Sequence, residues 1–308
     1  MNNDIMSTRN ETTVSLVLGS GGARGLAHIG VIHWLEENGF KIESISGCSV
    51  GALIGGIYGA GKLDDFEAWV REIKKVDILT LLDLSWEKSG LVKGDKLFHT
   101  LTDLVGDVLI EDLPIKFTAV AADIVNEKEL WMCSGKLFDA IRASVSLPLF
   151  FTPFMYGDIE LIDGGVLNPV PIAPTFSDAT DLTIAVNLGG KVDEKDKITR
   201  GKETQSEDKS SFTGKIVEFF EGFKEPKLKP RGEDWDAFDI VNLSFDVMQS
   251  TIGRQKLAAY PPDVFVEISR SACGILEFDL ASEMIDLGYK KAEEALNHLS
   301  SSNGDEQQ

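Results

Sequence analysis

The stretch Gly47-Cys48-Ser49-Val50-Gly51 decides the fold, because it places a Gly-x-Ser-x-Gly motif between a strand-like segment and a helix of small residues. We interpret residues 42–46 as the strand and residues 50–60 as the helix, whose N-terminus would stabilise negative charge at Ser49. A serine on so tight a turn has a strained backbone, and glycine neighbours let the chain pass closely beneath it. The pattern predicts a nucleophile elbow.

A second unit of the same order precedes the elbow. The apolar run 14–18 ends at the glycine-rich loop Gly19-Ser20-Gly21-Gly22-Ala23-Arg24-Gly25, after which apolar residues recur at helical spacing as far as Gly39. Two consecutive strand–loop–helix units predict an α/β fold with a mainly parallel sheet. Since ligands of such sheets bind beyond the carboxyl ends of the strands, the glycine loop and Ser49 should lie together.

The rest of the chain continues this alternation. We expect strands at 117–122, 182–188 and 264–268, and helices at 137–144 and 280–299. The domain organisation that follows is a polar N-terminal extension (1–13), one hydrolase-like domain (14–299) with a polar insert (189–236), and a polar tail (300–308).

The glycine loop allows two interpretations. Dinucleotide binding is disfavoured, because a G-x-G-x-x-G motif that starts at Gly19 would need glycine where Arg24 stands. The other interpretation is an oxyanion hole made by the backbone N–H groups of Gly21 and Gly22. Arg24 would then reinforce the loop, or it makes an ordinary surface ion pair.

A serine nucleophile needs a base, and the chain has four histidines: His28, His33, His99 and His298. Only His298 comes late enough to complete a Ser–Asp–His order, and it stands at the end of the last expected helix, which makes a triad doubtful. The carboxylate of Asp163, in Leu161-Ile162-Asp163-Gly164-Gly165, could instead reach Ser49 directly and act as the base. A turn or cap role for Asp163 remains the alternative.

The composition excludes several classes of function. The 308 residues include 30 basic and 50 acidic ones, a net charge of −20, which opposes binding to nucleic acid and weakens association with anionic membranes. The cysteines, Cys48, Cys133 and Cys273, are too scattered for a metal cage or a disulfide framework, and we expect reduced thiols in a cytoplasmic protein. Residues 1–13 lack the apolar core of a signal peptide, and residues 50–60 fall short of the roughly 20 needed to span a bilayer.

One segment of the polar insert bears on membrane contact. Between Phe212 and Phe223, apolar residues fall on one helical face, followed by several basic residues. This face either lies in a lipid interface as a lid or docking helix, or packs against the main domain. The first interpretation predicts a peripheral contact at the inner membrane surface.

Four blocks of the chain together resemble bacterial patatin-like phospholipases. They are the glycine loop, the elbow, Arg142-Ala143-Ser144-Val145-Ser146-Leu147-Pro148, and Asp163-Gly164-Gly165 followed by Asn168-Pro169-Val170-Pro171. The resemblance runs from Val14 to Leu188, and Asp83-Leu84-Ser85-Trp86 through Gly94 resembles the subgroup related to the catalytic domain of neuropathy target esterase. Ser20 departs from the pattern, since many members have glycine there.

The resemblance implies a three-layer α/β/α patatin-like fold and a Ser49–Asp163 catalytic dyad. The oxyanion hole would be formed by Gly21 and Gly22. The supporting loop would be Gly19, Ser20, Arg24 and Gly25, and the elbow and dyad glycines would be Gly47, Gly51, Gly164 and Gly165. The implied reaction is hydrolysis of acyl esters of phospholipids or lysophospholipids without metal or cofactor. The alternative is a catalytically weak relative that acts by binding a partner.

Overall fold

The computed structural model describes residues 11–81, 92–198 and 237–302. The described strands form one sheet in the order β5-β6-β3-β2-β1-β7-β8, with β4 also paired to β3. The strands are β1 (Thr12–Leu18), β2 (Phe40–Cys48), β3 (Lys116–Asp123), β4 (Lys128–Met132), β5 (Phe154–Tyr156), β6 (Ile159–Asp163), β7 (Leu182–Gly190) and β8 (Val264–Ser269). The central pairings are parallel, whereas β4, β5 and β6 join antiparallel.

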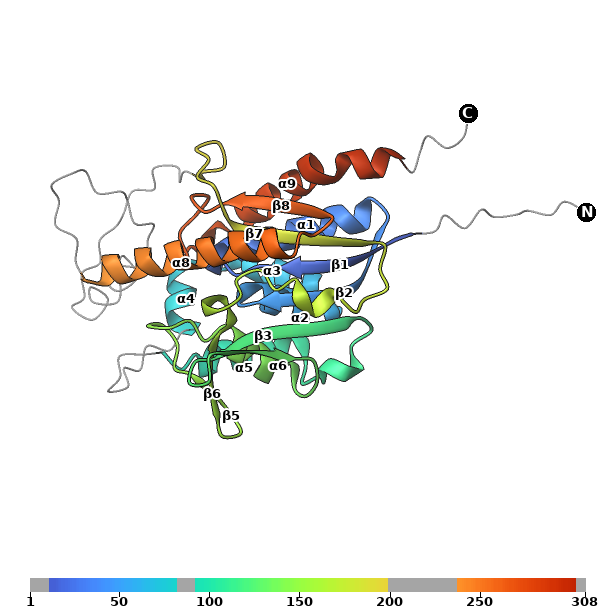
Figure 1. Ribbon diagram of the computed structural model, residues 1–308. Helices are drawn as coiled ribbons and strands as arrows, with labels where there is room; N and C mark the ends of the chain where they lie inside the picture. Colours follow the sequence, from blue (N-terminus) through green and yellow to red (C-terminus); the bar gives the residue numbers. More distant parts are fainter. Residues whose placement is uncertain (1–10, 82–91, 199–236, 303–308) are drawn as a thin grey trace, which may run out of the picture.

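Helices cover both faces of this sheet (Figure 1). The α-helices are α1 (Ala27–Glu37), α2 (Val50–Gly59), α3 (Leu63–Glu72), α4 (Lys75–Leu81), α5 (Asp95–Val105), α6 (Leu137–Ser144), α8 (Ala237–Ala259) and α9 (Ala281–Ser302). Short 3-10 helices include η1 (Gly22–Leu26), η3 (Gly164–Val166) and η4 (Ala173–Thr175).

The strand pleat divides the core between the two faces. Leu16 and Leu18 of β1 belong to the main core, to which α1, α2, α6 and α9 contribute. Val17, between them in the sequence, faces the opposite side and packs with Ile172 and with Leu257 of α8. Figure 1 shows α8 crossing the front of the sheet and α1 behind it. The predicted three-layer α/β/α fold with a mainly parallel sheet is therefore confirmed.

The register of β3 brings the end of β2 to the end of β6. Since β4 pairs with residues 119–123 along one edge of β3, β2 and β6 share the other edge. Cys48 pairs with Val120, and Asp163 pairs with Ala121, the next residue along β3. The chain leaves β2 for α2 directly after Cys48. Ser49 therefore lies beside Asp163 although 114 residues separate them in the sequence.

The element boundaries differ from the sequence-based expectation at a few points. The first helical segment begins as the 3-10 helix η1, and α1 starts at Ala27. The strand β1 begins at Thr12, β7 runs to Gly190, and α9 runs to Ser302, so the expected extension, insert and tail are each shorter by two or three residues. Most of the expected insert, including Phe212 to Phe223, lies outside the described residues, as does the segment 83–86.

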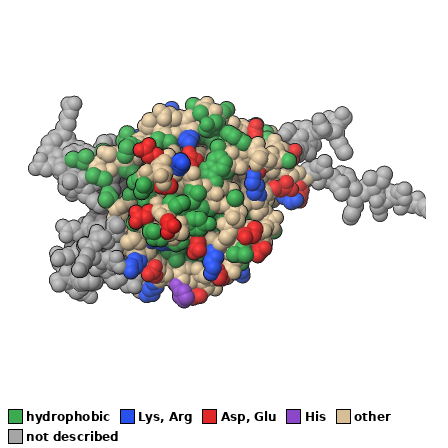
Figure 2. Space-filling model, turned by 60° about the horizontal axis from the view of Figure 1, so that its bottom comes forward, with side chains coloured by type: hydrophobic (Ala, Val, Ile, Leu, Met, Phe, Trp, Pro, Cys, Tyr) green, Lys and Arg blue, Asp and Glu red, His purple; other side chains and the backbone are tan. Residues whose placement is uncertain are grey.

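No helix within the described ranges is long and apolar enough to cross a bilayer. The face that holds the short strands β5 and β6 carries hydrophobic side chains interspersed with charged ones (Figure 2). Met155, Tyr156 and Ile159 of this hairpin are exposed.

Candidate active site

The turn between β2 and α2 has the backbone of a nucleophile elbow. Ser49 has φ 57° and ψ −125°, a conformation that costs an L-residue free energy and persists only where the surroundings hold it. A β-carbon on Gly47 would lie 2.5 Å from the Gly51 carbonyl oxygen, and one on Gly51 would lie 2.1 Å from the Leu18 oxygen. Both positions therefore require glycine, and the predicted elbow is confirmed.

Ser49 and Asp163 are hydrogen-bonded to each other. The Ser49 hydroxyl donates to Asp163 Oδ2 at 2.5 Å, and the Gly165 N–H donates to Asp163 Oδ1 at 2.7 Å. Burial raises the pKa of Asp163 to about 6, although both hydrogen bonds favour its charged form. A carboxylate in this position is ionised at neutral pH and basic enough to take a hydroxyl proton.

The segment Arg142 to Pro148 fixes both members of this pair. Ser144 Oγ accepts the Ser49 N–H at 2.9 Å and donates to the Val120 carbonyl at 2.6 Å. The Ser146 carbonyl accepts the Asp163 N–H at 2.9 Å. Sequence reasoning assigned Ser144 and Ser146 no individual role. The only feature in the sequence that could have pointed to them is their i, i+2 spacing.

The glycine loop presents two N–H groups that have no hydrogen-bond partner among the described residues. The N–H groups of Gly19, Ser20 and Ala23 donate to the carbonyls of Val186, Pro169 and Ile275, at 3.0, 2.8 and 2.7 Å. By contrast, neither the Gly21 N–H nor the Gly22 N–H donates to an acceptor in the described part of the chain. Gly22 has φ +58° and lines a cavity together with Ser49. These two groups suit a developing oxyanion at a substrate carbonyl.

Two buried side chains hold the loop in place. Arg24, only 7% exposed, donates from Nε to the Gly21 carbonyl at 3.1 Å and from Nη1 to the Arg270 carbonyl at 2.9 Å. The surface ion pair considered for Arg24 is therefore wrong, because its charge is buried in hydrogen bonds to carbonyls. His28 Nε2 donates to the Gly19 carbonyl at 2.9 Å, and burial lowers the pKa of this histidine to about 4, so the ring is neutral at pH 7.

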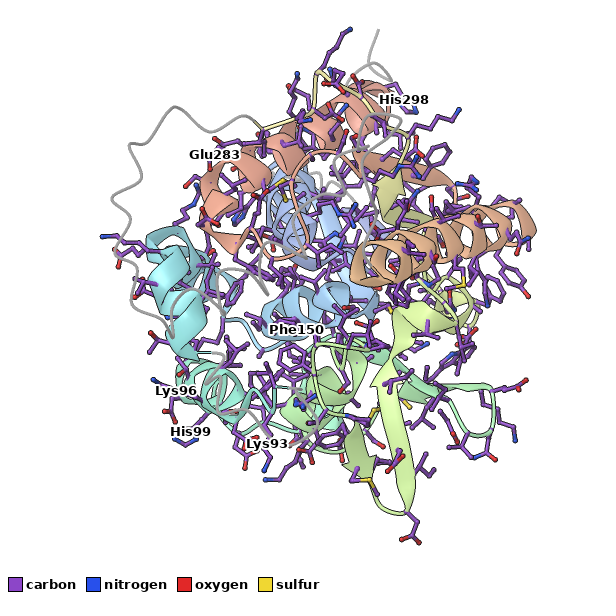
Figure 3. The ribbon with its side chains drawn as sticks, turned by 90° about the vertical axis from the view of Figure 1, so that its left-hand side faces the viewer. Lys93, Lys96, His99, Phe150, Glu283 and His298 are labelled. Atoms are coloured by element: carbon purple, nitrogen blue, oxygen red, sulfur yellow. The ribbon has the colours of Figure 1, made fainter. Side chains whose placement is uncertain are left out.

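The other histidines lie away from the dyad. His33 pairs with Glu67, and His99 with Asp103. Figure 3 shows His298 on α9 at one side of the molecule and His99 at another, whereas Phe150 lies near the centre. Because Asp163 bonds directly to the Ser49 hydroxyl, a histidine is not required between them.

Cys48, next to Ser49, is fully buried, and burial raises the pKa of its thiol well above the usual value. It stays protonated and fits the packing role expected from its position in the elbow.

An apolar cavity opens at Ser49. Apart from Gly22 and Ser49, apolar side chains line it: Val50, Leu53, Phe66, Trp69, Val70, Ile73, Ile78, Leu81, Leu97, Phe98, Leu101, Val145, Leu147, Phe150, Phe151, Ile275, Leu276 and Phe278. Sequence reasoning missed α3, α4 and α5, which supply many of these. From the sequence, the apolar cluster 147–154 suits either an acyl channel or the core, and core is the more common place for such a cluster. Within that cluster, Leu147, Phe150 and Phe151 line the cavity, whereas Leu149 is 46% exposed.

Arg142 packs against two aromatic rings of the cavity wall. Its guanidinium lies 5.2 Å from the ring centre of Phe98 and 5.1 Å from that of Phe151, and it donates to Ser146 Oγ at 2.6 Å. A further hydrogen bond of 3.1 Å reaches the Thr152 carbonyl. Burial lowers the pKa of Arg142 to about 10, which leaves it charged at pH 7. These contacts link the cavity wall to the segment that fixes the dyad.

Comparison with known proteins places this site in a family. Residues 16–176 match the model of the patatin-like phospholipase family. An uncharacterized NTE family protein of Mycobacterium tuberculosis is 36% identical over 92% of this chain and 91% of its own length. Lysophospholipase NTE1 of Kluyveromyces lactis is 26% identical over 94% of this chain, which spans 20% of that larger protein. Neuropathy target esterase sws of Drosophila melanogaster is 31% identical over 59% of this chain and 13% of its own length. The family model covers half of the sequence and the elbow, the glycine loop and Asp163 all fall inside it, so this chain belongs to the patatin-like phospholipase family.

Proposed function

We propose that the protein hydrolyses acyl esters of phospholipids or lysophospholipids, with Ser49 as nucleophile and Asp163 as general base. The observation that carries this proposal is the 2.5 Å hydrogen bond between Ser49 and Asp163 at the mouth of an apolar cavity. The family, and relatives that include a lysophospholipase, support a lipid ester as substrate.

The reaction would proceed in two steps. Asp163 takes the Ser49 proton as Oγ attacks the ester carbonyl carbon, and the Gly21 and Gly22 N–H groups stabilise the oxyanion. Asp163 then returns the proton to the departing alcohol oxygen, which leaves an acyl ester on Ser49. In the second step Asp163 takes a proton from water as the water oxygen attacks the acyl carbon. The bond between the acyl carbon and Ser49 Oγ then breaks, Asp163 gives the proton to Oγ, and the fatty acid leaves. Neither step requires a metal or an organic cofactor.

The apolar cavity would hold the acyl chain. Burying a methylene group is worth about 0.8 kcal/mol, so a cavity lined by apolar side chains favours a long chain over a short one. We also propose that the protein is cytoplasmic and meets its substrate by peripheral contact at the inner membrane surface.

Hydrolysis of lysophosphatidylcholine and of a short-chain p-nitrophenyl ester tests this function. We expect Ser49→Ala to lower kcat/KM for both esters by about four orders of magnitude or more, and Asp163→Asn to lower kcat strongly. The matched control is Ser46→Ala, because Ser46 is buried in β2, the strand that precedes Ser49, and its hydroxyl has no hydrogen-bond partner among the described residues.

Ester turnover by folded, pure Ser49→Ala protein at the wild-type rate would remove Ser49 from the mechanism. Absence of turnover in the folded wild type would favour the partner-binding alternative.

A further inference from the structure

A second pocket, polar in character, lies across the glycine loop from the apolar cavity. Its lining includes Ser20 and Arg24 of the loop, Asp246 and Gln249 of α8, and Arg270, which follows β8. The two pockets share no lining residue. In Figure 3, α8 lies on one side of the molecule's centre and helices α3 to α5, which line the apolar cavity, lie on the other.

Two side chains that line the polar pocket lie close to Gly165, two residues after Asp163. A β-carbon built on Gly165 would lie 2.4 Å from Gln249 Nε2, 2.8 Å from Ser20 Oγ and 3.0 Å from Asp163 Oδ1. Two side chains of the polar pocket and the dyad carboxylate therefore surround the same space beside the α-carbon of Gly165.

The pocket offers hydrogen-bond donors that the protein does not use. Gln249 Nε2 is buried and has no hydrogen-bond partner within the described residues, an arrangement that costs free energy unless a ligand accepts the bond. The guanidinium of Arg270, an exposed residue, donates no hydrogen bond within the described residues, although it lies close enough to Asp246 to favour the charged form of that carboxyl. Arg24 donates hydrogen bonds to carbonyls from Nε and Nη1, and its Nη2 donates none within the described residues.

The charge of the pocket is opposite to that of the whole chain. Two arginines against Asp246 leave one net positive charge, in a protein whose net charge is −20. Both arginines favour the ionised form of Asp246, although burial raises the pKa of this carboxyl. Arginine together with amide donors is the usual environment for a phosphate group.

The geometry of ester cleavage directs the leaving group toward this side. The acyl and alkoxy substituents diverge from the carbonyl carbon, so an ester with its acyl chain in the apolar cavity places its alcohol part on the opposite side. Asp163 returns the proton to the leaving oxygen, so the alcohol part must lie beside Asp163. We propose, on the basis of the function proposed above, that the polar pocket binds the phosphate of a glycerophospho leaving group, with Gln249 and Arg270 as specificity-determining residues.

The test compares two substrates with the same short acyl chain, used below their micellar concentrations. One is a lysophosphatidylglycerol, which carries the phosphodiester, and the other is a 1-monoacylglycerol, which has none. We expect Arg270→Gln and Gln249→Met each to lower the ratio of kcat/KM for the phosphodiester to kcat/KM for the neutral ester by about tenfold or more. Asp246→Asn should move this ratio in the opposite direction, because it removes the negative charge of the pocket.

Arg254→Ala is the matched control. Arg254 is also on α8, but its guanidinium is bonded to Ser250 and Thr251, and it does not line the pocket. Its substitution should leave the ratio unchanged.

A ratio that stays constant across the Arg270, Gln249 and Asp246 variants would overturn the assignment. Inhibition of monoacylglycerol hydrolysis by inorganic phosphate together with an unmoved ratio would also overturn it, since the pocket would then hold a free anion and not the substrate headgroup. Failure of the proposed function itself is distinct, because neither ester would then show turnover that depends on Ser49.

Discussion

Replacement of Asp163 by asparagine should abolish turnover and at the same time stabilise the protein at neutral pH. The carboxyl is fully buried, and its pKa is raised from 3.8 to about 6. A pKa shift of about two units means that the folded environment destabilises the charged carboxylate, relative to the neutral acid, by roughly 3 kcal/mol. Asparagine keeps the shape and both hydrogen-bond positions but carries no charge, so the variant avoids this penalty.

The sign of the pH dependence follows from linkage. Below pH 3.8 the carboxyl is protonated in both the folded and the unfolded chain, and it contributes no difference. Between pH 3.8 and about 6 the unfolded chain releases the proton while the folded protein keeps it, so wild-type stability falls as the pH rises. Above about pH 6 the loss of wild-type stability caused by the buried carboxylate no longer changes with pH. The free energy of unfolding of Asp163→Asn relative to wild type should therefore grow by roughly 2 kcal/mol between pH 4 and pH 7.

His28 titrates in the same window with the opposite sign. Its pKa is about 4 in the folded protein and 6.5 in the unfolded chain, so the unfolded chain binds more protons and stability rises with pH. This contribution is common to the wild type and to Asp163→Asn. It cancels in their difference, which isolates Asp163.

Urea unfolding followed by tryptophan fluorescence, at several pH values from 4 to 8, measures this difference. Asp158→Asn, at an exposed turn position, serves as the control for losing a carboxylate. The reasoning fails if the difference between Asp163→Asn and wild type is the same at pH 4 and pH 7.

Three further outcomes follow from the structure. Gly47→Ala should destabilise the protein by about 3 kcal/mol or more, since the new β-carbon would lie 2.5 Å from the elbow backbone. Gly39→Ala should cost only about 1 kcal/mol, because Gly39 has φ +78° but open space around it. Equal losses of stability in urea unfolding would contradict this steric explanation. Leu53→Trp should fill the apolar cavity next to Ser49 and shift the preference from long to short acyl esters. An unchanged chain-length preference would mean that the acyl chain does not bind in this cavity. Arg142→Lys should lower Tm and slow the turnover of long-chain esters. Lysine cannot make the hydrogen bonds to both Ser146 and Thr152 while it lies over the Phe98 and Phe151 rings. A variant indistinguishable from wild type in both assays would show that Arg142 does not support the site.

The parts of the site predictable from sequence are those encoded by short-range patterns. The elbow and the glycine loop each follow a strand and precede a helix, so glycine spacing and apolar periodicity locate both. The proximity of Asp163 to Ser49 could only be expected by analogy, because it depends on β6 pairing antiparallel with the same edge of β3 as β2, directly beyond the last residue of β2. Nothing local in the sequence indicates this long-range pairing.

Other features were missed for different physical reasons. A cavity wall is made of the same apolar side chains as a core, so Phe150 and Phe151 carry no signal that distinguishes the two. Gln249, 86 residues beyond Asp163 in the sequence, approaches Gly165 from α8, and a single glutamine on a helix shows no pattern at all. The role of Arg24 required its burial to be known, since an exposed arginine in the same sequence would form an ion pair.

Labelling with a fluorophosphonate probe, with the modified peptide identified by mass spectrometry, tests the central claim most directly. We expect one adduct, on Ser49, formed by wild type and by Ser46→Ala, absent in Ser49→Ala and much slower in Asp163→Asn. An adduct on any other residue, or labelling of folded Ser49→Ala protein at the wild-type rate, would contradict the assignment of Ser49 as a nucleophile activated by Asp163.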